Sequence, residues 1–154
     1  MIGFSIVLIL FASFFFGLLL HYLAKSELKI GRKYINALRY LCLWGFLLVI
    51  SVFANMKGKF YVSIGTIFLM FALSYNYRHV NKLIATVFGA GLFLATGDRL
   101  FLILSTLVLM FGLAHGTLVV EKSYNQAIKR LIFDYGFMIL TYLLLWTFFS
   151  WYTF

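Results

Sequence analysis

LFLILSTLVLMFGLAHGTLVV, residues 100–120, is an apolar stretch with Arg99 before it and Glu121 after it. A helix of about 20 such residues is long enough to cross the hydrocarbon core of a bilayer. Because the stretch contains no Asp, Glu, Lys or Arg, no charged side chain opposes its burial in lipid. The stretch predicts a transmembrane helix, so the rest of the chain is expected to have a composition that is compatible with a lipid bilayer.

The composition of the whole chain agrees with this prediction. Of its 154 residues, 64% are hydrophobic and 11% are charged, whereas soluble proteins average about 45–50% and about 25%. These values exclude a disordered protein, a disulfide scaffold and a cytosolic enzyme. The single cysteine, Cys42, cannot form an intramolecular disulfide and is interpreted as a small buried hydrophobic residue.

Six apolar stretches follow one another along the chain: 2–24, 40–56, 60–77, 83–96, 100–120 and 131–154. The first, fifth and sixth are long enough to span a bilayer, the second and third are at the short limit, and the fourth lies below it. We predict an all-α fold: a polytopic integral membrane protein whose residues 1–154 form one bundle of about six short transmembrane helices.

The orientation of the bundle is predicted from Lys and Arg, which stay in cytoplasmic loops. If all six stretches span, ten of these residues fall on one side and three on the other. Both termini are then outside, in a plasma or inner membrane. If 83–96 were re-entrant, the count would be eight against five, a weaker bias, so we prefer six spans.

The basic residues predict contacts with anionic lipid headgroups on the cytoplasmic face. A formal net charge of +9 would suggest nucleic acid in a soluble domain, but these charges lie between apolar segments, so we expect no nucleic-acid partner. The loops 25–39 and 121–130, which can also extend the neighbouring helices, carry the residues with this role: Lys25, Lys29, Arg32, Lys33, Arg39, Lys122, Lys129 and Arg130.

A weak internal repeat occurs at an offset of 40 residues. Residues 59–73 align with 99–113, and the Met-Phe pair at 70–71 recurs at 110–111. One interpretation is that 40–77 and 83–120 are two copies of a helical hairpin, because such repeats build some transporters. The other is that Leu- and Phe-rich helices resemble one another by composition alone.

Small residues predict close helix packing. Gly112 and Gly116 form a GxxxG pair in the fifth span, and Ser13 and Gly17 lie four residues apart in the first. Small side chains let two helix backbones approach closely. The four residues therefore predict a tight helix contact, either within the bundle or between copies of the chain.

Three ionisable residues in or near the spans form the candidate polar site: His115, Asp134 and His21. Ionisable groups inside a membrane are rare and are functional hypotheses by default. One interpretation is structural, with both histidines bonded across helices and Asp134 paired with Arg130 one helical turn away. The other is a proton relay from His115 to Asp134, since histidine titrates near neutral pH.

Motifs for metals, cofactors and catalysis are missing from the sequence. The histidines and Asp134 lack the spacing of a metal site, and no GxSxG or P-loop motif occurs. We predict no metal, no cofactor and no catalytic residue; whether the chain is an enzyme stays undecided, with a non-enzymatic protein favoured.

Three functions are compatible with these patterns. The first is a non-enzymatic membrane protein that acts through helix–helix association, as a homo-oligomer or as a subunit or accessory factor of a membrane complex. The second is a small-solute or ion transporter or channel with a proton-linked site. The third is an intramembrane enzyme that modifies lipid. Of these, the first is favoured, because no soluble domain is predicted.

Overall fold

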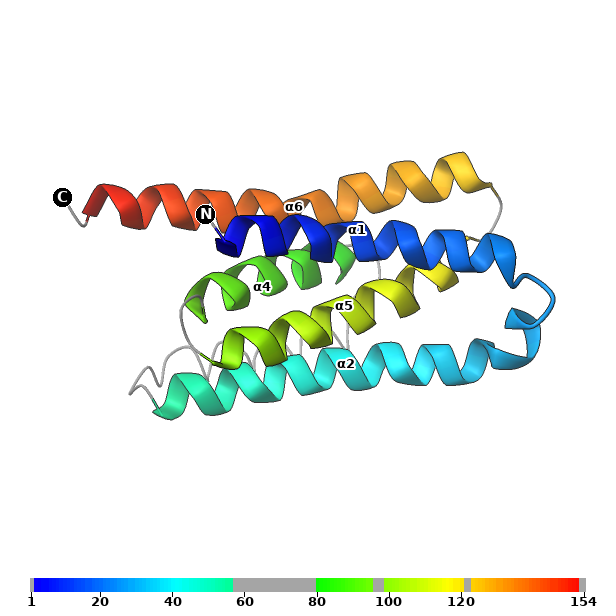
Figure 1. Ribbon diagram of the computed structural model, residues 1–154, viewed down its shortest axis with the longest axis horizontal. Coiled ribbons are helices and arrows are strands. Elements are labelled where there is room, and N and C mark those ends of the chain that lie inside the picture. The colour runs from blue at the N-terminus through cyan, green and yellow to red at the C-terminus, as the bar shows by residue number, and fades with distance from the viewer. Residues whose placement is uncertain (1, 57–79, 96–98, 121–122, 153–154) are drawn as a thin grey trace.

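The computed structural model describes residues 2–56, 80–95, 99–120 and 123–152. The described residues form five α-helices: α1 Ile2–Leu23, α2 Leu28–Met56, α4 Val80–Leu94, α5 Leu100–Leu118 and α6 Tyr124–Tyr152. The helices lie side by side with roughly aligned axes and form a bundle (Figure 1). The chain contains no proline, so no helix is interrupted by a missing backbone N–H.

Four of these helices, α1, α2, α5 and α6, are long and apolar enough to cross a membrane, whereas α4 is an apolar helix of 15 residues. α1 and α5 coincide within two residues with the predicted spans 2–24 and 100–120. The predicted third span, 60–77, lies outside the described residues. The first copy of the 40–77/83–120 repeat is therefore described only in part.

α2 and α6 begin well before the apolar stretches that predicted them. α2 starts at Leu28 rather than at Tyr40, and α6 starts at Tyr124 rather than at Leu131. The basic loops are thus partly helical extensions. Lys and Arg are good helix formers, and their long side chains can reach the headgroups while the backbone stays helical, so a helix continues past the end of its apolar stretch.

The helices alternate in direction (Figure 1). α1 ends and α2 begins at one end of the bundle, joined by the turn at residues 24–27, and α5 ends and α6 begins at the same end. We call this the basic end, because the turn and the starts of α2 and α6 carry most of the described Lys and Arg. The first residue of α1 and the last of α6 lie at the opposite end.

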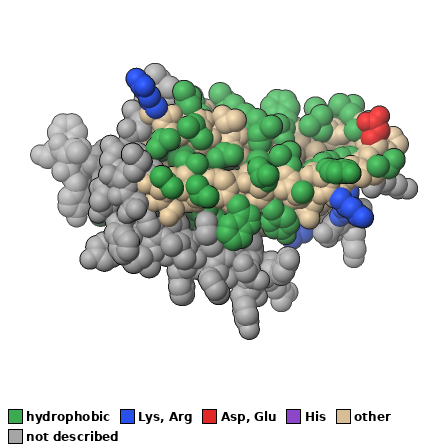
Figure 2. Space-filling view, turned by 90° about the horizontal axis from the view of Figure 1, so that it is seen from below, with side chains coloured by type: hydrophobic (Ala, Val, Ile, Leu, Met, Phe, Trp, Pro, Cys, Tyr) green, Lys and Arg blue, Asp and Glu red, His purple; other side chains and the backbone are tan. Residues whose placement is uncertain are grey.

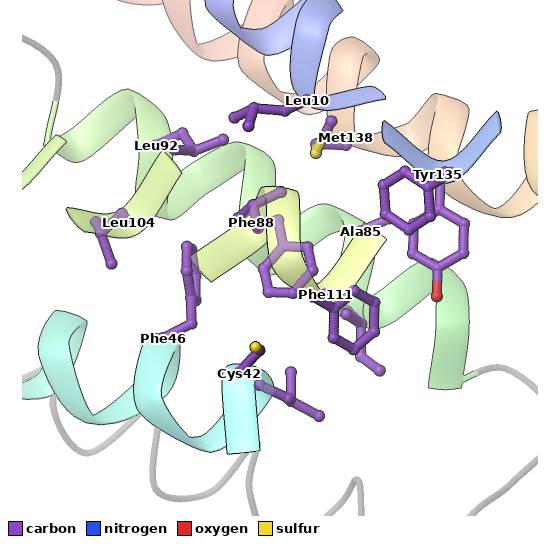
Figure 3. Close-up of a cluster of buried hydrophobic side chains, with 14 of the residues drawn as sticks. Leu10, Cys42, Phe46, Ala85, Phe88, Leu92, Leu104, Phe111, Tyr135 and Met138 are labelled. Atoms are coloured by element: carbon purple, nitrogen blue, oxygen red, sulfur yellow. The ribbon is translucent and has the colours of Figure 1, made fainter. Parts of the chain in front are cut away.

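α5 is the central helix. Of its span, 56% is buried, compared with 28% or less for the other long helices. Around it, aromatic rings connect the elements: Phe46 of α2 meets Phe88 of α4 edge-on at 4.6 Å between ring centroids, and Phe88 meets Phe111 of α5 at 5.0 Å (Figure 3). This core packs α5 against α1, α2 and α4, and its side chains are more enclosed than those of the other long helices that the structure describes.

The outer surface of the bundle is apolar as well. Leu41, Leu102 and Phe133 are 68%, 68% and 63% exposed. On the described part of the face seen in Figure 2, hydrophobic side chains are spread over the surface and the charged ones lie toward its two ends. A water-soluble helix would turn a polar face outward. The described part of the chain therefore has the build of a membrane-embedded helical bundle.

α1 and α5 approach each other through small residues. A Cβ added at Gly112 would lie 3.2 Å from the Cβ of Ser13, and one added at Gly116 would lie 3.0 Å from the Cα of Gly17. The Ser13 hydroxyl donates to the Leu10 carbonyl of its own helix at 2.6 Å, so it leaves no unpaired polar group in the contact. All four small residues that the sequence singled out thus meet in one crossing within a single chain.

Candidate functional site

His115 lies where α1, α2, α5 and α6 meet, and its side chain is 5% exposed. Phe111, one turn earlier on α5, stacks parallel to the imidazole at 5.5 Å between ring centroids. Phe14 of α1 and Tyr135 of α6 meet it edge-on at 6.3 and 5.1 Å. The tight α1–α5 crossing brings Phe14 to this position, because Ser13 and Gly17 on the same helix allow the close approach.

Arg39 of α2 reaches the same place. Its Nη1 lies 3.5 Å from His115 Nδ1, and its guanidinium carbon lies 4.7 Å from the centroid of the Tyr40 ring. The side chain is half-buried. Because α2 is already helical eleven residues before Arg39, this arginine is a helix residue facing the bundle. Besides its predicted role at the headgroups, it contacts the interior histidine.

The contact with Arg39 determines which nitrogen of His115 carries a proton. An arginine has only donors, so Nδ1 accepts the bond and the neutral ring carries its hydrogen on Nε2. Among the described residues, Nε2 has no hydrogen-bond partner. A buried ionisable side chain in a membrane protein is a candidate for a functional role, and a polar atom without a hydrogen-bond partner needs an explanation. His115 has both features.

Tyr135 contributes a second open polar atom. Its ring is fully buried and stacks on Phe14 at 4.0 Å, with 28° between the planes. The hydroxyl points away from Leu10 and Met138 of the hydrophobic cluster (Figure 3), and within the described residues it has no partner. Arg39, His115 and Tyr135 form what we call the inner polar site, with side chains from α2, α5 and α6.

Asp134 belongs to a different set of contacts. Its Oδ2 accepts a hydrogen bond from Asn81 of α4 at 3.2 Å and lies 3.8 Å from Arg130 Nε on its own helix. The carboxylate side chain is 14% exposed. The ion pair with Arg130 has the spacing that the sequence suggested, while the contacts of His115 in the described structure are to other residues. The relay between His115 and Asp134 stays a prediction.

His21 joins three helices near the basic end. Its Nδ1 donates to the Thr117 carbonyl of α5 at 2.6 Å, and its ring meets Tyr124 of α6 edge-on at 6.1 Å between centroids. The Thr117 hydroxyl is satisfied by the Ala114 carbonyl at 2.7 Å. His21 therefore lies in an interhelical contact with its Nδ1 bonded, separate from the inner polar site.

The basic residues assigned to the headgroups are mostly exposed. Lys25, Arg32, Lys33, Lys129 and Arg130 all have exposed side chains. Lys29 lies in α2, and Lys122 lies outside the described residues. Across the described part of the chain, no three side chains of His, Cys, Asp or Glu come together as metal ligands.

Two members of this region were not assigned a site role from the sequence. For Tyr135, the position beside Asp134 is the one signal that the sequence offers. Asn81 lies between the predicted spans 60–77 and 83–96, in the first turn of α4, and nothing in the sequence pairs it with Asp134. Both contacts join residues more than fifty positions apart or on different helices, so they require the tertiary structure.

No known protein family, curated protein or solved structure matches this chain. Its function therefore has to be argued from its own residues.

Proposed function

We propose that this protein is a transporter or channel for a small solute or ion, in which His115 exchanges protons. The observation that carries the proposal is the inner polar site: a histidine enclosed by four helices, with Nε2 open and an arginine on Nδ1. His115 carries its hydrogen on Nε2, so it would take up a further proton on Nδ1 when Arg39 leaves that nitrogen; a histidine that exchanges protons in this way is a common element of proton-linked membrane proteins.

A second buried polar atom on α5 supports this function. Ser105 is 8% exposed and its hydroxyl has no partner among the described residues. It precedes His115 by ten residues, which is about 15 Å along a helix. The central helix thus offers polar groups at two depths of the bundle, as a path for a solute or ion through the interior requires.

The alternative, a protein that acts by helix–helix association, has less support from the geometry. Part of its support in the sequence is the set of small residues, and Ser13, Gly17, Gly112 and Gly116 are in contact with one another inside one chain. They are not free to bind a second copy or a partner. Association through another surface would need its own evidence, and for this reason we favour transport.

Proton flux in proteoliposomes tests the proposal. Vesicles that contain the protein and a pH-sensitive dye are acidified from outside while valinomycin and potassium clamp the potential. We expect faster internal acidification than in protein-free vesicles. Thr106→Ala is a matched control on α5, because this exposed hydroxyl bonds only the Leu102 carbonyl, and it should keep the wild-type rate. A wild-type rate equal to that of empty vesicles would contradict the proposal.

We further propose that the chain crosses the membrane six times, with both termini outside and the basic end in the cytoplasm of a plasma or inner membrane. The charge bias supports this orientation. So does the course of the chain: α2 ends at the end of the bundle away from the basic end, whereas α4 begins partway along the bundle and runs toward that same end (Figure 1). Residues 57–79 would then hold one further crossing.

Cysteine labelling tests the topology. Single cysteines at Ser26 and Lys57 are introduced after replacing Cys42, which is buried. Because Ser26 lies in the exposed turn at the basic end, an impermeant reagent added outside intact cells should label position 57 and leave position 26 unlabelled until the cells are opened. Labelling of both positions from outside would contradict six spans.

A further inference from the structure

We infer that the inner polar site binds a small anion between Arg39, His115 and Tyr135. The inference names the substrate class of the proposed transport, and its role in transport rests on that proposed function. The binding itself rests on the hydrogen-bonding groups and the charge of the site.

The two polar groups of the site that have no partner among the described residues, His115 Nε2 and the Tyr135 hydroxyl, are suited to bind a hydrogen-bond acceptor. Nδ1 of His115 is bonded to Arg39, so the open Nε2 carries a hydrogen and donates. The open hydroxyl of Tyr135 can donate as well. A buried donor without an acceptor is costly, and one acceptor placed between the two side chains would satisfy both.

The charge of the site makes a negative acceptor the best match. Arg39 is permanently charged and has five N–H donors, of which His115 Nδ1 can take one. Two acidic residues are described in the structure: Glu27 in the exposed turn, and Asp134, which is bound by Asn81 and Arg130. Among the described residues, therefore, no carboxylate neutralises this half-buried arginine. An anion would supply the missing charge.

The distances in the site limit the size of the ligand. Arg39 and His115 are 3.5 Å apart at their nearest nitrogens, and the rings of His115 and Tyr135 are 5.1 Å apart at their centroids. Phe111 and Phe14 stack on these rings and hold them in place. A ligand that reaches all three groups must be small: a dissolved inorganic anion, or the phosphate of a lipid headgroup, which offers the same chemistry.

Thermal unfolding of the detergent-purified protein tests binding without any transport assay. Gluconate is replaced by chloride, nitrate or phosphate at constant ionic strength, and in a separate series phosphatidylglycerol is compared with phosphatidylcholine. A ligand that binds only the folded state raises the unfolding midpoint as its concentration increases. We expect such a rise for the wild type. A rise with dissolved anions identifies a free anion, and a rise with phosphatidylglycerol alone identifies the phosphate of an anionic lipid. Either result supports the site if Arg39→Gln removes the rise.

Variants locate the binding. Arg39→Gln should lose the anion-dependent rise, whereas Arg99→Gln, which removes an exposed arginine before the start of α5, should keep it. If Arg39→Gln does not fold, Tyr135→Phe is tested instead, because it removes the hydroxyl and retains the ring that packs on Phe14. This variant should have a smaller anion-dependent rise than the wild type. An undiminished rise in Arg39→Gln or in Tyr135→Phe overturns the inference, as does the absence of a rise with every anion and lipid.

The two proposals can fail separately. Anion binding in a protein that conducts no protons would retain the anion site and overturn the transport function. Proton flux in a protein that shows no anion-dependent stability would retain the transport function and overturn the anion site.

Discussion

Gly116→Ala is expected to lower the free energy of unfolding by roughly 1–3 kcal/mol, the usual cost of overpacking a well-packed contact. The added Cβ would overlap the Phe14 carbonyl oxygen and lie 3.0 Å from both Gly17 Cα and Leu18 N. These are backbone atoms, which cannot turn aside as a side chain would. The change therefore forces α1 away from α5. Because Phe14 lies on α1, the substitution also moves Phe14 away from His115.

Gly136→Ala on α6 is the matched control. A Cβ at this position meets nothing within 4 Å, and alanine is more favourable than glycine in a helix by up to about 1 kcal/mol. This variant should be as stable as the wild type or slightly more so. Denaturant-induced loss of helicity in detergent, followed by circular dichroism, measures both. Equal stability of the two alanine variants would show that α1 and α5 do not cross at Gly116.

His115→Ala is expected to reduce proton flux in proteoliposomes to the rate of protein-free vesicles. The imidazole is the proposed proton carrier of the inner polar site, and this variant removes it while Arg39 and Tyr135 remain. The flux is measured at several external pH values in wild-type and variant vesicles of equal protein content. Undiminished flux in a well-folded His115→Ala protein would remove the histidine from the mechanism.

Asp134→Asn separates the inner polar site from the proton relay suggested by the sequence. Asp134 is bonded to Asn81 and Arg130, so the variant should retain most of the flux and lose only a little stability. Measured interhelical polar contacts in a membrane average about 0.6 kcal/mol. If Asp134→Asn instead abolishes flux as His115→Ala does, the two residues act together and the relay is supported.

Helix ends show where prediction from the sequence reached its limit. The apolar stretches located α1 and α5 within two residues, but α2 and α6 begin twelve and seven residues earlier than their stretches. A hydropathy pattern marks the part of a helix that suits lipid, whereas the helix itself continues as long as its backbone hydrogen bonds do. Arg39 looked like a headgroup residue for this reason, although it lies inside α2 and contacts His115.

The sequence by itself determined that the chain is helical and apolar enough for a membrane, and which residues are small enough for a close crossing. These properties are local: hydropathy, the lack of proline and a four-residue spacing can be read from one segment at a time. Only the tertiary structure decided that Ser13 and Gly17 meet Gly112 and Gly116, that Arg39 and Tyr135 surround His115, and that Asp134 turns to Asn81. Those pairings depend on the rotation and depth of each helix against its neighbours, which are set by side-chain packing across the whole bundle.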